Sequence, residues 1–169
     1  MLILGLDPGS LHTGYGLVEK RGTAVELRDV GRISCPRGQP LGMRLAHLVS
    51  RLEELLRGAR PDLAVLETPF HGLNARSLIV LAEARGALLA TLAGAGVEIA
   101  EYSPAEVKSA ITGNGRAGKD QVARMVRLLL AAPGYDWAAV APDTTDALAL
   151  ALCCAQRLRL DRLRGPLRS

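Results

Sequence analysis

Four acidic residues stand where this sequence can perform chemistry: Asp7, Glu67, Asp143 and Asp146. Asp7 and Glu67 each end a short apolar run that is typical of a buried strand. An ionised carboxylate taken out of water loses several kcal/mol of solvation unless it is paired. Acids at such positions therefore indicate a site that binds something cationic.

Asp143 and Asp146 lie three residues apart at the start of a long apolar helix. This spacing puts both side chains on one face of the helix, close to its N-terminus. Acids from distant parts of the sequence can thus converge on one site. An all-oxygen cluster with no required His or Cys suits hard cations such as Mg²⁺ or Mn²⁺.

The pattern of apolar residues predicts an α/β fold that carries these acids. The first three strands should form an antiparallel meander, and the later alternation of helix and strand predicts parallel strands with right-handed crossovers. We expect a mixed five-stranded sheet with helices on both faces, whose ligands lie beyond the carboxyl ends of strands, where Asp7 and Glu67 fall. The expected strands are 2–6, 13–18, 25–34, 62–67 and 97–102, and the expected helices are 41–58, 74–93, 104–112, 119–132 and one after Pro142.

The composition is that of one globular domain. The 169 residues are 49% hydrophobic and 22% charged, which excludes a disordered chain. We expect one domain over 1–169, with 160–169 a flexible basic tail. The net charge of +4 hints at a polyanionic partner. No run of eighteen uncharged apolar residues occurs, so a cytoplasmic location without membrane contact is expected.

The three cysteines do not indicate a disulfide framework or a zinc site. Cys153 and Cys154 are neighbours on an apolar helix, and Cys35 leaves an odd number. The histidines have no ligand-like spacing from them. Buried, inert thiols are expected.

Two glycine-containing segments could bind phosphate. The run Asp7–Ser10 with Thr13–Gly16 resembles the first phosphate loop of the actin, hexokinase and heat-shock ATPase superfamily, but this chain is too short for that family's two domains. Residues 113–119 have the spacing of a Walker A loop, yet Asp120 stands where a hydroxyl should bind Mg²⁺, and the segment follows a helix. We interpret it as a basic loop beside the site, with a plain linker as the alternative.

An ordered set of motifs over nearly the whole chain resembles the RuvC family of bacterial Holliday junction resolvases. Any single motif is weak, but the ordered set is highly specific. The motifs are Ile3–Ser10 with Thr13–Gly16, Glu67-x-x-Phe70 with Asn74-Ala75, Ala84-Arg85-Gly86, Val107-Lys108, Gly118-Lys119-x-Gln121-Val122 and Asp143-x-x-Asp146-Ala147-Leu148-Ala149.

This resemblance implies a ribonuclease H-like fold, a homodimer, and paired symmetric nicks in a four-way DNA junction. It also implies a transient complex with the branch-migration motor and the junction-binding protein. By position, Asp7, Glu67, Asp143 and Asp146 match the family's metal-binding acids, Phe70 matches a base-stacking aromatic, and Lys108 and Lys119 match lysines that contact DNA near the scissile phosphate. We expect Arg116, in the same basic loop as Lys119, to contact DNA as well.

Phosphodiester hydrolysis by two bound cations needs no side-chain nucleophile. The acids would hold the ions, and Lys119 would offset phosphate charge as part of the catalytic set. We therefore interpret the hydroxyls of Ser10, Thr13, Thr144 and Thr145 as turn or capping groups.

The sequence departs from the family directly after Glu67. Thr68-Pro69 stands where the family commonly has Gln, and this affects the expected orientation of Phe70. Two other functions remain open at this point: a nuclease of the same fold that cuts single-stranded DNA or structured RNA, and a non-enzymatic junction-binding protein.

Overall fold

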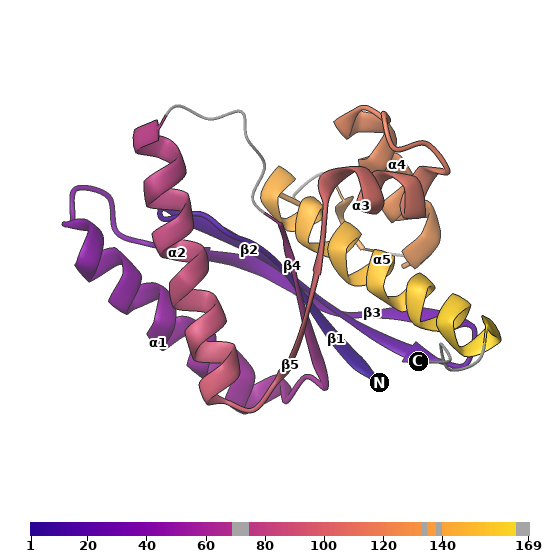
Figure 1. Cartoon of the computed structure of the whole chain (residues 1–169), viewed down its shortest axis with the longest axis horizontal. Coiled ribbons are helices and arrows are strands. Elements are labelled where there is room, and N and C mark those ends of the chain that lie inside the picture. The colour runs from indigo at the N-terminus through magenta and orange to yellow at the C-terminus, as the bar shows by residue number, and fades with distance from the viewer. Residues whose placement is uncertain (69–74, 133–134, 138–139, 165–169) are drawn as a thin grey trace.

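A five-stranded mixed sheet forms the centre of the molecule (Figure 1). The computed structural model describes residues 1–68, 75–132, 135–137 and 140–164. The strand order is β3-β2-β1-β4-β5, with β1, β2 and β3 antiparallel and β4 and β5 parallel to β1. The predicted sheet is confirmed. The strands are β1 (Leu2–Asp7), β2 (His12–Arg21), β3 (Ala24–Ser34), β4 (Leu63–Glu67) and β5 (Glu98–Tyr102).

The hairpin of β2 and β3 is longer than the sequence pattern predicted. We expected β2 to end near residue 18, before the charged run Glu19-Lys20-Arg21, but it continues to Arg21. Ion pairs explain the extension, because Glu19 pairs with Arg28 across the hairpin and with Arg21 on its own strand. Gly22 closes the turn with a φ of 59°, the left-handed conformation that a tight hairpin loop requires.

Helices cover both faces of the sheet, as predicted (Figure 1). On one face α1 and α2 enclose a core with one side of β1 and β4, and on the other α3, α4 and α5 enclose a second core. The helices are α1 (Leu41–Ala59), α2 (Ala75–Gly94), α3 (Pro104–Thr112), α4 (Lys119–Leu130) and α5 (Pro142–Arg164).

Local signals set several helix ends. The capping box predicted at the start of α3 is present, with Ser103 accepting from the Glu106 N–H and the Glu106 carboxylate accepting from the Ser103 N–H. The basic tail was expected to begin at residue 160, but α5 continues to Arg164. Leucine and arginine are good helix formers, whereas the following Gly165-Pro166 is not. The expected N-cap Asn74 and residues 165–169 lie outside the described residues.

Helix α5 lies unusually close to the sheet. Residues 147–155 of the helix are all buried. A Cβ atom at Gly5 would overlap the carbonyl of Ala147, and one at Gly14 would overlap the carbonyl of Asp143. Glycine at these two strand positions therefore lets the start of α5 approach the ends of β1 and β2.

Helix α2 has a mostly apolar surface, and the rest of the described chain leaves much of it exposed. Among the described helices it alone is long and apolar enough to cross a membrane, by length and composition only, and 17% of it is buried. However, it packs along α1, and Arg85 in its middle pairs with Glu101 of β5. These contacts are typical of a helix in a globular fold.

Candidate active site

Asp7 and Glu67 lie side by side at the carboxyl ends of the neighbouring strands β1 and β4. Leu6 of β1 is paired with Leu66 of the parallel strand β4, so the next residue of each strand is an acid at the same edge. Both line a pocket of about 270 Å³. The convergence that the sequence indicated for these two residues is thus present in the structure.

Helix α5 adds the other two acids, in different positions. Asp146 lines the same pocket as Asp7 and Glu67. Asp143 lies beside the pocket: its Oδ1 accepts a hydrogen bond from the Thr144 N–H at 2.9 Å, and its Oδ2 is 3.9 Å from Arg32. Its negative charge still reaches Asp7 and raises the pKa of that carboxyl.

Burial and mutual repulsion perturb the acids. Burial, followed by the charges of Asp146, Glu67 and Asp143, raises the pKa of Asp7 to about 7. Burial and Asp146 likewise raise the pKa of Glu67. Such shifts mean that the ionised cluster lacks sufficient positive charge around it. A bound cation would supply that charge.

Two lysines face the acids across the pocket. Lys108 of α3 and Lys119, the first residue of α4, both line it. The Lys119 ammonium lies 3.3 Å from Oδ2 of Asp146, which raises the lysine pKa. Because the Lys119 side chain is 82% exposed, it can move from Asp146 to an entering phosphate without leaving a packed position.

Arg116 does not join this group. It is exposed in the loop between α3 and α4, and its backbone N–H donates to the side chain of Asn114. The same loop buries Ala117 and turns at Gly113, whose φ is 76°. Residues 113–118 therefore set the start of α4, and with it the position of Lys119.

The donor set fits hard divalent cations. Carboxylates from β1, β4 and α5 supply only oxygen atoms, as Mg²⁺ and Mn²⁺ prefer. In the described part of the chain, no three acidic, His or Cys groups are already drawn into a ligand cage. Lys119 neutralises Asp146 instead, and Asp143 turns toward Arg32. Side-chain rotation at these two residues would complete the set.

Sequence reasoning gave no role to Arg85, which supports the strand end that carries Glu67. Its Nε–H donates to the Glu67 carbonyl at 3.2 Å, and its guanidinium pairs with Glu101. The side chain is only 15% exposed. An arginine in the middle of a mostly apolar helix was the available signal, because a buried guanidinium needs nearby acceptors.

The threonine hydroxyls bond within the protein, and Thr13 has the turn role that we expected. Thr13 donates to the Gly9 carbonyl at 2.8 Å and accepts from the Gly9 N–H, which closes the turn after Asp7. Thr144 donates to the Gly31 carbonyl and ties α5 to β3. Phe70 and the preceding Pro69 lie outside the described residues.

Comparison with known proteins by sequence gives one family. The family model described as crossover junction endodeoxyribonuclease RuvC matches residues 3–154. Proteins of that name from Anaeromyxobacter dehalogenans and Alkalilimnicola ehrlichii are 46% and 47% identical, over 90% and 89% of this chain and 80% and 88% of theirs.

Solved structures agree with the sequence comparison. Thermus thermophilus RuvC in complex with a Holliday junction substrate has a TM-score of 0.86 at 32% identity, covering 95% of this chain and 96% of that one. The yeast mitochondrial Holliday junction resolvase Ydc2, at 14% identity and a TM-score of 0.72, shares the fold; it covers 96% of this chain and 82% of that one. The carboxylates on β1, β4 and α5 thus belong to a ribonuclease H-like nuclease fold, and the chain is a member of the RuvC family of crossover junction endodeoxyribonucleases.

Proposed function

We propose that this protein resolves four-way DNA junctions by paired symmetric nicks through metal-dependent phosphodiester hydrolysis. The observation that carries the proposal is the pocket where Asp7, Glu67 and Asp146 meet Lys108 and Lys119. Its acids suit cations and its lysines suit phosphate. The Thermus thermophilus relative, which shares the fold at 32% identity, was solved with a Holliday junction substrate.

The four acids hold the cations in this proposal. Asp7 and Glu67 are fixed by adjacent strands, whereas Asp143 and Asp146 come from the first turns of α5. Two ions of Mg²⁺ or Mn²⁺ would supply an activated water and stabilise the charge that develops on the leaving 3′ oxygen. The chain itself contributes the rigid placement of the carboxylates.

Lysines and the segment after β4 act on the DNA. Lys119 releases Asp146 and turns to the scissile phosphate, while Lys108 balances charge beside Glu67. We also propose Arg116 as a contact to a more distant phosphate and Phe70 as a base-stacking residue near the opened crossover. A stacked ring there would help to hold the junction open.

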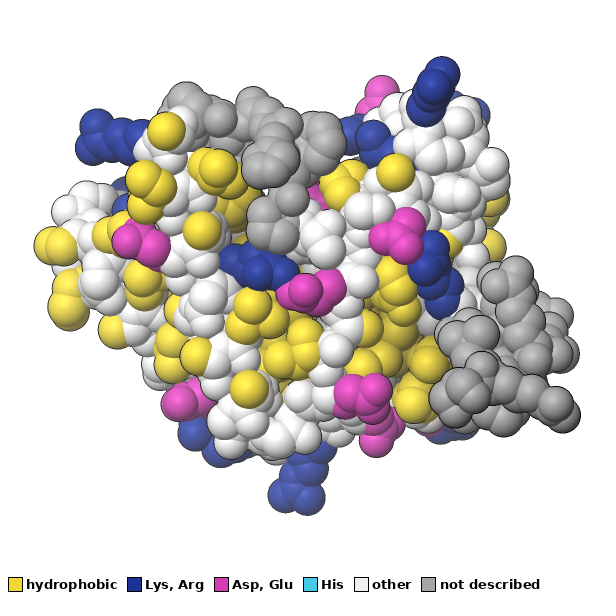
Figure 2. All heavy atoms as spheres, viewed as in Figure 1, with side chains coloured by type: hydrophobic (Ala, Val, Ile, Leu, Met, Phe, Trp, Pro, Cys, Tyr) yellow, Lys and Arg dark blue, Asp and Glu magenta, His cyan; other side chains and the backbone are white. Residues whose placement is uncertain are grey.

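Two symmetric nicks call for a two-fold dimer with two active sites. Helix α2 is the surface that we propose for it. Ile79 is 59% exposed, and small residues follow it on the exposed side at helical spacing, at Ala82, Gly86 and Ala90. Figure 2 shows hydrophobic side chains along α2 on the face turned to the viewer. A second copy packed on this helix would bury them.

The cellular setting of the proposal follows from the substrate. The protein would act on chromosomal DNA in the cytoplasm, in a transient complex with the branch-migration motor and the junction-binding protein.

The test compares three substrates with Mg²⁺ and with chelator: a synthetic four-way junction, its linear duplex and a hairpin RNA. We expect paired nicks in the junction alone and only with the metal, and no cleavage by Asp146→Asn despite retained junction binding. Cleavage of the RNA instead would favour another nuclease of this fold. Binding without any cleavage would leave a junction-binding protein.

A further inference from the structure

We propose that a groove between α1 and the ends of β2 and β3 binds backbone phosphates of a junction arm, outside the cleavage pocket. This α1 groove has a volume of about 440 Å³. The inference rests on the proposed function in one respect, the identity of the ligand as DNA. Among the lining residues are Tyr15, Arg32, Ser34, His47, Arg51 and Glu54.

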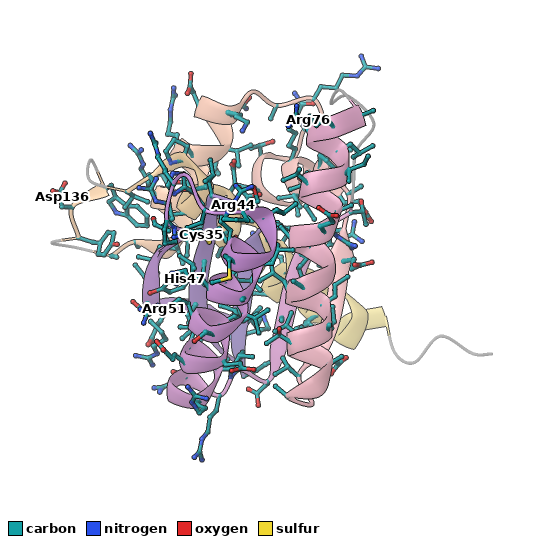
Figure 3. The ribbon with its side chains drawn as sticks, turned by 90° about the vertical axis from the view of Figure 1, so that its left-hand side faces the viewer. Cys35, Arg44, His47, Arg51, Arg76 and Asp136 are labelled. Atoms are coloured by element: carbon teal, nitrogen blue, oxygen red, sulfur yellow. The ribbon has the colours of Figure 1, made fainter. Side chains whose placement is uncertain are left out.

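A row of basic side chains on α1 leads from the turn beside the cleavage pocket into the groove. Arg44, His47 and Arg51 are spaced by three and four residues, which puts them on one face of the helix. Figure 3 shows them following one another along α1, near Cys35 just beyond the end of β3. At 1.5 Å per residue the row is about 10 Å long.

Arg44 connects the row to the turn that follows β1, beside the active site. Its Nη1 donates to the Ser10 hydroxyl at 3.0 Å, and Ser10 lies in the turn that follows Asp7. Among the described residues its buried Nε has no hydrogen-bond partner. Leaving a buried donor unpaired costs about 1–3 kcal/mol.

Arg32 connects the groove to the acids from the other side. It lines the groove from β3, and its Nη1 is 3.9 Å from Oδ2 of Asp143. Arginine side chains therefore lie both beside the start of α5 and on α1. DNA that enters the cleavage pocket can extend past these arginines, across the ends of β2 and β3.

The groove chemistry fits an anion such as a phosphodiester better than an apolar ligand. Arg32 and Arg51 provide two positive charges against the one negative charge of Glu54. Arg51 pairs with Glu54, but both side chains are about half exposed, at 56% and 46%. Such pairs are worth about 0–1 kcal/mol, so a phosphate can displace Glu54 from Arg51.

The distances indicate which phosphates reach the groove. Ser10 follows Asp7 by three residues and is thus within about 10 Å of it. The row on α1 extends about 10 Å further. With about 3.4 Å of rise per nucleotide, the groove meets phosphates roughly three to six nucleotides from the scissile one.

The test measures junction affinity in chelator, where cleavage does not occur, over a range of salt concentrations. The variants are Arg51→Gln and Glu54→Gln, each with a control at an exposed position of α1 that lines a different pocket: Arg57→Gln and Glu53→Gln. Loss of one phosphate contact lowers the slope of log affinity against log salt concentration by about 0.9. This corresponds to an affinity about eightfold weaker at 0.1 M salt. We expect this loss for Arg51→Gln, tighter binding for Glu54→Gln, and wild-type binding for both controls.

A second experiment identifies the phosphates. Neutral methylphosphonates at the third to sixth positions from the cleavage site should weaken binding by the wild-type protein, and should weaken binding by Arg51→Gln less, because that variant has already lost one of the contacts. Equal affinities of Arg51→Gln and Arg57→Gln, or additive losses with the methylphosphonates, would refute phosphate binding in the groove. The proposed function would still hold if the wild type cleaves the junction with Mg²⁺. Absence of cleavage by the wild type would instead overturn the proposed function and leave the groove as a DNA-binding site.

Discussion

The ionised form of Asp7 should destabilise the folded protein, and Asp7→Asn should remove that destabilisation. In the folded protein its pKa is about 7, against 3.8 for an ordinary aspartate, because of burial and the neighbouring acids. The folded state thus holds a proton that the unfolded state has lost between about pH 4 and 7, so stability falls as pH rises through that window. The pKa difference corresponds to an upper bound of about 4 kcal/mol.

Thermal unfolding in chelator measures this effect. For a chain of this size each kcal/mol changes the melting temperature by about 2–4 °C, so Asp7→Asn should melt up to roughly 8–16 °C higher than wild type at pH 8. At pH 4 the two should melt alike, because Asp7 is then protonated when folded. Glu53→Gln, at an exposed acid of α1, is the control and should show no pH-dependent gain.

Mg²⁺ provides the opposite check. It should raise the melting temperature of the wild type at pH 8 by binding the folded state, and raise that of Asp7→Asn much less. A variant that is stabilised equally at pH 4 and pH 8, or destabilised at pH 8, would refute the view that Asp7 is a buried acid short of positive charge. Cleavage by this variant should be lost while its junction affinity is equal to or slightly above wild type, since negative charge facing phosphates is removed.

Three further predictions address the residues around the acids. Lys119→Ala should reduce cleavage more than binding and flatten the salt slope of log affinity by at most about one; unchanged cleavage would return residues 113–119 to a linker role. Arg85→Met should lower cleavage at least tenfold with a smaller change in junction affinity, because the Glu67 carbonyl loses its donor; an unchanged rate would show that Arg85 does not position Glu67. Phe70→Ala should keep its melting temperature within a few degrees and lose activity on fully paired junctions, with rescue by unpaired bases at the centre, since stacking is worth about 1–3 kcal/mol per base. A large drop in melting temperature without rescue would instead assign Phe70 to the core, where truncation costs about 3–5 kcal/mol.

The sequence by itself determined the class of fold, the family and some of the ends of the elements. Strand-length apolar runs that end in Asp7 and Glu67, and glycine, proline and capping residues between periodic segments, are local signals. Ser103 and Glu106 are an example: their capping box depends on residues three apart and forms as predicted. The acids could be nominated for the same reason, because an acid at the end of an apolar run is visible in the sequence.

Only the tertiary structure decided how the acids are arranged. Asp143 and Asp146 share a helix face, yet one turns toward Arg32 of β3 and the other toward Lys119 of α4, since those partners come from elsewhere in the chain. Other features likewise depend on contacts between segments distant in sequence. They are the close approach of α5 to Gly14, the hydrogen bond from Arg85 to the Glu67 carbonyl and the one from Arg44 to Ser10. Such contacts follow from packing, which local propensity and periodicity do not encode.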